Sequence, residues 1–293
     1  MKFNSIFEKY LFYNLPVFLF SLLPFFLVTG PFLSDLSVSL ISLLFLIYCL
    51  KSKNFSFFKN IYFYLFLIFW SYLVINSLIN NYNTDSFKIS FFYVRFGIFV
   101  VAIIALLQFD AKFVKYLFYC LFFCFTVLTV DGFYQYFTGE NIVGYKSISR
   151  HRVSSFFFDE LILGSYLSRL WPIFFALSTL FFKIKKIYYP IVFLFICSEV
   201  LIFLSGDRSA FFNINLSAIF IILFSQNLFK LRLVTMLSSI LLIVMVKFIN
   251  PSSFDRVVNK TIRDMNLNNK NQTTFIFSKQ HTHHYITAYK MFR

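Results

Sequence analysis

Long apolar runs separated by short polar stretches dominate the chain from residue 11 to residue 249. Each run is about 17–22 residues long, which is the length a helix needs to cross the hydrocarbon core of a bilayer. The pattern therefore predicts an all-α, polytopic integral membrane bundle of nine transmembrane helices. The predicted spans are Leu11–Thr29, Phe32–Leu50, Ile61–Ile79, Ile89–Phe109, Phe113–Asp131, Leu161–Phe182, Ile187–Ser205, Ser209–Leu228 and Leu233–Ile249.

The basic residues of the short loops fall on one side of the membrane if every run crosses it once. The positive-inside rule makes that side, and the N-terminus, cytoplasmic. The opposite side then holds a long loop over residues 132–160, a turn at residues 206–208 and a polar segment over 250–293. We therefore expect a membrane domain over 1–249 and an outer segment over 250–293. The loop cations are Lys51, Lys53, Lys59, Lys112, Lys115, Lys183, Lys185, Lys186, Lys230 and Arg232.

Composition excludes a soluble domain, because 59% of the 293 residues are hydrophobic and only 13% are charged. The net charge of +15 then reflects cytoplasmic loops, and we expect no nucleic-acid partner. Four cysteines lie within apolar runs, where thiols behave as small apolar groups, so neither a disulfide nor a metal site is expected from them. No nucleotide-binding motif is present, and we expect no cofactor.

Charged residues within membrane spans are costly and need a reason. Arg95, Arg169 and Glu199 lie inside predicted spans, and Asp131 ends one, all at a similar expected depth near the outer surface. One interpretation is a polar cavity open to the outside. The other is internal ion pairing, for example of Glu199 with Arg95 or Arg169.

Two outer segments combine an arginine with small polar residues. Arg152 precedes a pair of serines in the long loop, and Arg208 lies in a turn that joins two spans. A guanidinium matches phosphate oxygens, and nearby helix starts offer free N–H groups, so both segments predict anion binding. The structural alternatives are a helix start capped by a serine or by Asp159, and an Asp207–Arg208 pair or a snorkelling arginine.

Three histidines, His281, His283 and His284, lie in the outer segment. Imidazoles can act as general bases or bind zinc, but no cysteine or carboxylate stands beside these histidines. A solvated polar segment is the interpretation this spacing favours, and no metal is expected. A helical apolar pattern follows over His284–Phe292.

Together, three stretches on the outer side resemble the O-antigen ligase and O-antigen polymerase superfamily. They are RVSSFFFDELILGSYL from Arg152, LSGDRSA around Arg208, and HYITAYKMF from His284. The resemblance implies a helical membrane enzyme that transfers a glycan from undecaprenyl diphosphate on the periplasmic side. The acceptor is lipid A-core or another lipid-linked repeat, and neither metal nor nucleotide takes part.

By this resemblance Arg152 and Arg208 match two arginines that hold the donor diphosphate, and Arg95, Arg169 and Glu199 would shape the cavity. The family's candidate base, a histidine, follows the stretch that matches His284–Phe292. It is therefore expected beyond Arg293, in a chain that resembles a truncated member, and no catalytic residue is assigned.

We expect the chain in the bacterial inner membrane, in contact with membrane lipids, the donor and the acceptor. Two alternatives stay open. One is a transporter or flippase for a lipid-linked or anionic solute, in which the same arginines recognise cargo. The other is an inactive truncated member of the superfamily.

Overall fold

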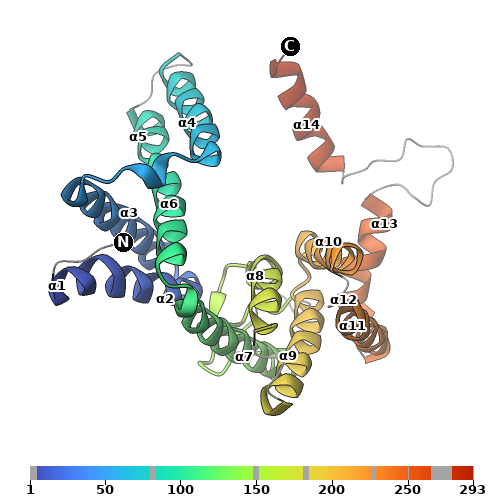
Figure 1. The fold of residues 1–293 in the computed structure, drawn as a ribbon. Helices are drawn as coiled ribbons and strands as arrows, with labels where there is room; N and C mark the ends of the chain where they lie inside the picture. The colour runs from blue at the N-terminus through green and yellow to red at the C-terminus, as the bar shows by residue number, and fades with distance from the viewer. Residues whose placement is uncertain are drawn as a thin grey trace. The chain divides into compact units, whose positions relative to one another are not determined.

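The computed structural model describes residues 5–79, 84–147, 152–180, 185–225, 229–249, 251–264 and 279–292. Within these ranges the chain is mostly helical, with loops between helices and one isolated antiparallel bridge between Glu140 and Lys146 (Figure 1). Contacts divide it into two compact units, residues 1–121 and 122–293. The all-α prediction is confirmed for the part of the chain described.

Six helices are long and apolar enough to cross a membrane, which supports a helical membrane bundle. The nine-span count is not confirmed, because the apolar helical segments between residues 163 and 224 are shorter than the six candidate spans. They are α8 (Leu163–Ser178), the apolar part of α9 at Tyr188–Leu204, and α10 (Arg208–Phe224). The six candidate spans are Ile6–Thr29, Pro31–Ser52, Ile61–Ile79, Thr84–Phe109, Ala111–Thr138 and Phe229–Phe248.

The first unit is built from seven helices and short connecting turns. Its core forms where α2, α3 and α6 pack together, with Phe12, Ile41, Phe45 and Val101 buried. Small residues of α6 such as Ala102 allow the helices to approach closely, as is common between membrane helices. The elements are α1 (Ile6–Lys9), a π turn (Tyr10–Asn14), α2 (Leu15–Thr29), α3 (Pro31–Ser52), a 3-10 turn (Ser56–Phe58), α4 (Ile61–Ile79), α5 (Thr84–Phe92), α6 (Val94–Phe109), a 3-10 turn (Ala111–Phe113) and the start of α7 (Val114–Thr138).

In the second unit α8 packs on α9 and α10, and α11 packs on α9 and α10. Aromatic rings fill the core: Phe174 of α8 lies 4.8 Å from Phe125 of α7 and 5.0 Å from Phe195 of α9, centroid to centroid. The elements are the rest of α7, a 3-10 turn (Ser155–Phe157), α8, α9 (Lys185–Leu204), α10, α11 (Phe229–Ile249), α12 (Pro251–Phe254), a π turn (Asp255–Asn259), α13 (Lys260–Asp264) and α14 (Lys279–Phe292).

Two stretches predicted to lie outside the membrane spans contain helix. The loop expected from residue 132 begins only after Thr138, because α7 continues past Asp131 and packs Gly132 against Leu201. The polar segment predicted over 250–293 contains helical turns over residues 251–264, which we call the return segment. Its Phe254 ring lies 6.3 Å from that of Phe203 at the end of α9, so apolar contact brings it back to the bundle.

Candidate functional site

The turn between α9 and α10 is compact and depends on one glycine. Gly206 has φ +66°, a conformation that side chains with a Cβ rarely adopt. Asp207 caps α10: its Oδ1 accepts from the N–H of Ser209 at 3.1 Å and of Ala210 at 3.2 Å. Its Oδ2 accepts from the Ser165 hydroxyl at 2.7 Å. The turn is thus tied to both α10 and α8.

The hydrogen bonds to Asp207 give the turn a dependence on pH. Burial alone raises the pKa of Asp207, but the bonds from Ser165, Ser209 and Ala210 outweigh it and hold the pKa below its ordinary value. This stabilisation is fully present above the ordinary pKa of an aspartate and is lost as the pH falls through the depressed pKa.

We therefore expect acid to loosen the turn. Thermal unfolding midpoints measured from neutral pH down to about pH 3 should fall more steeply for the native chain than for Asp207→Asn. Asparagine still caps the helix but has no charge to lose. Parallel curves for the two proteins would show that Asp207 does not carry this dependence.

Close packing of α8 against the turn depends on Gly164. A Cβ at this position would lie 2.2 Å from the Ser205 hydroxyl oxygen and 3.2 Å from the Ala210 Cβ. We expect Gly164→Ala to destabilise the chain by about 1–3 kcal/mol, because the turn must shift to admit the methyl group. The midpoint of unfolding in detergent measures this, and an unchanged midpoint would contradict the packing described.

Arg152 lies directly against this turn, as the anion-binding prediction requires of a site residue. Its Nε donates to the Ser205 carbonyl at 3.0 Å, and its Nη2 to the Leu161 carbonyl at 3.4 Å. The backbone N–H of Val153 donates to the Leu204 carbonyl at 3.3 Å. These bonds hold the arginine at the end of α9, and each of them is to a main-chain carbonyl.

A buried polar cluster on α7 positions the loop that carries Arg152. The Gln135 side-chain oxygen accepts from the N–H groups of Ser154 and Ser155 at 2.9 and 2.8 Å. Asp131 accepts from the Ser155 hydroxyl, and also from the N–H of Ile142 at 2.8 Å. Asp131 is fully buried, so it holds the loop in place and does not face an open cavity.

A third arginine, which the sequence analysis missed, lies at the same turn. Arg256 of the return segment donates from Nε to the Gly206 carbonyl at 3.2 Å. A Cβ on Gly206 would lie 3.0 Å from the Arg256 Cδ and 3.1 Å from the Arg152 Cγ. The two arginines therefore meet over a glycine that leaves room for both.

Burial and the neighbouring charges shift the pKa of Arg152. Its pKa is lowered, first by burial and then by the positive charge of Arg256, while Asp207 acts in the opposite direction. Within the described residues neither Arg152 nor Arg256 forms a salt bridge, and both donate hydrogen bonds to main-chain carbonyls. Two like charges held together in this way favour an anion between them.

Arg208 completes the group, which we call the arginine turn: Arg152, Arg208 and Arg256 around residues 205–207. Arg208 begins α10, and its Nη1 lies 2.7 Å from Oδ2 of Asp264, the last residue of α13. The predicted Asp207–Arg208 pair is not among the salt bridges of the described residues, since Asp207 is used as a cap.

The other predicted site residues lie elsewhere. Arg95 belongs to the first unit, where its Nη2 lies 2.6 Å from Oδ1 of Asp35 on α3. Arg169 is exposed on α8. Glu199 pairs with Arg232, not with Arg95 or Arg169 as suggested. The structure thus brings Arg152 and Arg208 to one turn, whereas Arg169 and Glu199 of the same unit have other surroundings.

Arg232 also corrects the count of loop cations. It was assigned to a cytoplasmic loop, but it lies inside α11 and is only 1% exposed. Its guanidinium carbon lies 4.2 Å above the Trp171 ring, and Glu199 also accepts from the Ser239 hydroxyl at 2.6 Å. The apolar core accepts this arginine because its partner and an aromatic face are buried with it.

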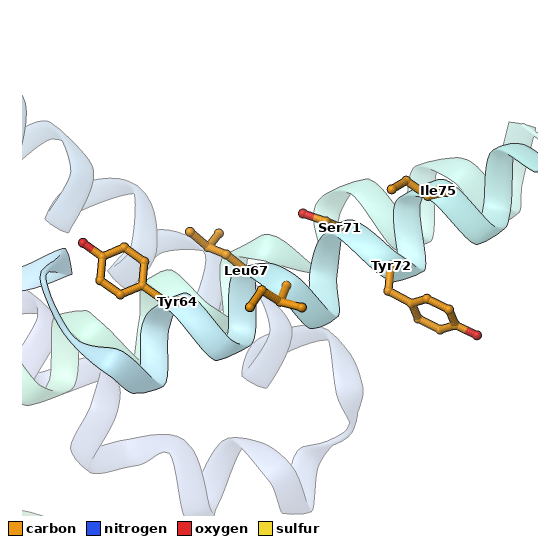
Figure 2. A pocket seen from close by; sticks show the side chains of 6 residues that line it. Tyr64, Leu67, Ser71, Tyr72 and Ile75 are labelled. Atoms are coloured by element: carbon orange, nitrogen blue, oxygen red, sulfur yellow. The ribbon is translucent and has the colours of Figure 1, made fainter.

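The histidines of the outer segment lie on α14, where His283 and His284 are exposed; the side chain of His281 lies outside the described residues. The described residues contain no cluster of ligands able to hold a metal ion. A hollow of about 590 Å³ lies along α4 in the first unit, lined by Tyr64, Leu67, Ile68, Ser71, Tyr72 and Ile75. Figure 2 shows the lining side chains spread along a single helix, and none of them is charged.

Comparison with protein-family models, with curated proteins and with solved structures finds no match to this chain. The argument for function therefore rests on the geometry of the arginine turn.

Proposed function

We propose that this chain is a membrane glycan transferase of the O-antigen ligase or polymerase type, and that the arginine turn binds the diphosphate of its lipid-linked donor. The observation that carries the proposal is the meeting of Arg152 and Arg256 over Gly206, with Arg208 beginning the next helix. Guanidinium groups pair well with phosphate oxygens, and main-chain bonds hold two of these in place before any ligand arrives.

The chemistry uses the arginines to stabilise the leaving group. An acceptor hydroxyl oxygen attacks the anomeric carbon of the glycan, and the bond from that carbon to the diphosphate oxygen breaks. The diphosphate departs with the bonding electrons, and the arginines would stabilise the negative charge that develops on it in the transition state. The hydroxyl proton passes to a base, which we do not assign to any residue of this chain.

The proposal includes a setting in the membrane. The arginine turn would face the periplasm, the N-terminus the cytoplasm, and the chain would cross the inner membrane nine times. The donor would be undecaprenyl-diphosphate-linked, and the acceptor lipid A-core or another lipid-linked repeat. The loop cations support this orientation through the positive-inside rule, although Arg232 no longer counts among them.

Glycan assembly in cells tests the proposal. In a host whose own gene is deleted, surface-glycan ladders should appear with the native gene and disappear with Arg152→Ala or Arg208→Ala. Arg263→Ala is the matched control, because Arg263 lies on the return segment but pairs with Asp255 at 3.0 Å. Normal ladders from correctly inserted Arg152 and Arg208 variants would refute the transferase assignment. Movement of the lipid-linked glycan without bond formation would favour a flippase.

A further inference from the structure

The arginine turn contains its own competing anion. We infer that Asp264 occupies Arg208 in the unliganded protein and that the donor diphosphate displaces it, so that Asp264 sets the affinity of the site. This inference rests on the proposed function. It adds to the three arginines that bind the ligand a fourth residue, Asp264, which weakens that binding.

The contact has the properties of a replaceable partner. Arg208 Nη1 and Asp264 Oδ2 are 2.7 Å apart, and the two side chains are 35% and 32% exposed. A dissolved or membrane-bound anion can therefore reach the pair. The buried pair of Arg232 and Glu199 differs, since both side chains are almost fully enclosed and exchange of partner there would bury an unpaired charge.

The two aspartates at the site have different tasks. Asp207 receives bonds from Ser165 and Ser209 and from two N–H groups at the start of α10, so the fold needs its carboxylate. In the part of the chain described, the Asp264 carboxylate accepts a hydrogen bond from Arg208 alone. Removing the Asp264 carboxylate from the site leaves the cap of α10 intact.

Charge matching supports the displacement. Three arginines with Asp207 and Asp264 carry a net charge of about +1, and moving Asp264 away leaves about +2. A diphosphate that joins a lipid to a sugar carries two negative charges. The site without Asp264 therefore balances the charge of the ligand. With Asp264 in place, the site's net positive charge is smaller than the ligand's negative charge.

An opposite role for Asp264 makes an opposite prediction. If the carboxylate only orients Arg208 toward the ligand, its removal should weaken binding. If it competes with the ligand, its removal should strengthen binding. The sign of the change in affinity separates the two roles.

The experiment measures binding of farnesyl diphosphate and of inorganic pyrophosphate to the full chain in detergent by calorimetry. Asp264→Asn is compared with Asp255→Asn, which removes the same charge from the same segment, away from Arg208. We expect Asp264→Asn to bind about three- to tenfold more tightly than Asp255→Asn. Asp264→Glu keeps the competing charge and should bind as the native chain does. Unfolding midpoints establish that each variant is folded.

The outcomes separate this inference from the proposed function. Equal affinities for the two asparagine variants, or weaker binding by Asp264→Asn, would overturn the inference while binding by the native chain persists. If neither the native chain nor any variant binds either probe, the proposed function fails together with the inference. Tighter binding of pyrophosphate but not of farnesyl diphosphate by Asp264→Asn would overturn displacement by a lipid-linked donor.

Discussion

Glu199→Leu is expected to destabilise the second unit by about 3–5 kcal/mol, because it leaves the Arg232 guanidinium buried without its counter-charge. Arg232 is 1% exposed and has no route to solvent without unpacking α11 from α9. The Trp171 ring, which lies 4.2 Å below the guanidinium, replaces only a small part of the lost interaction. Chemical unfolding followed by tryptophan fluorescence in a Trp70→Phe background, where Trp171 is the fluorophore, measures the loss.

A double variant provides the control for this prediction. Glu199→Leu with Arg232→Leu removes both charges and leaves an apolar contact of similar volume, so most of the lost stability should return. A double variant as unstable as Glu199→Leu alone would show that shape, not the unpaired charge, causes the loss. Full stability of the single variant would contradict burial of the pair.

The Glu199–Arg232 pair also helps to position the arginine turn. Glu199 lies on α9, which ends at the arginine turn, and Arg232 lies on α11, which leads into the return segment. The pair therefore joins the two helices that bring the Gly206 carbonyl and Arg256 together. Its loss should weaken anion binding as well as stability.

The second large effect concerns Arg256. Arg256→Ala is expected to lower the affinity for farnesyl diphosphate about 10- to 100-fold, because a charge-assisted hydrogen bond contributes about 1.5–3 kcal/mol. Arg152→Ala should cause a loss of similar size, since the two arginines share one side of the turn. Calorimetric titration of the folded full chain measures both.

Arg263→Ala is the matched control for Arg256, because the two arginines lie on the same return segment and the same charge is removed. Arg263 is directed to Asp255 and is 62% exposed, so its loss should leave affinity almost unchanged. Similar losses of affinity for Arg256→Ala and Arg263→Ala would mean that the net positive charge of the return segment controls binding, and not contact at the arginine turn.

Much of the helical architecture follows from hydropathy alone, because apolar runs of membrane length have few other folds open to them. The hydropathy pattern predicts the end of a helix poorly where the helix continues with polar side chains. Asp131 and Gln135 lie one turn apart on α7 and face a buried loop, so the helix continues beyond the end of the apolar run. Hydropathy marks the end of the apolar run, not the end of the helix.

The buried pair had a signal in the sequence. Arg232, Thr235 and Ser239 are spaced by three and four residues and share one face of a helix, which the structure directs to Glu199. Such a polar face inside an apolar run indicates an internal contact. Counting Arg232 only as a loop charge missed it.

Almost nothing in the sequence pattern predicts Arg256 as a site residue. The return segment contains few apolar residues, and its place at the turn depends on contacts between positions far apart in the sequence, such as Phe203 with Phe254. Local pattern cannot predict such contacts. Arg152 and Arg208 are predicted from the sequence because each lies in a short motif, whereas Arg256 lies in none.

The central claim is that the arginine turn binds a diphosphate. A structure of the full chain determined with farnesyl diphosphate bound tests it most directly. The account predicts phosphate density in contact with the side chains of Arg152, Arg208 and Arg256, with Asp264 moved away from Arg208. Phosphate density located elsewhere, with the three arginines keeping the partners they have here, would contradict it.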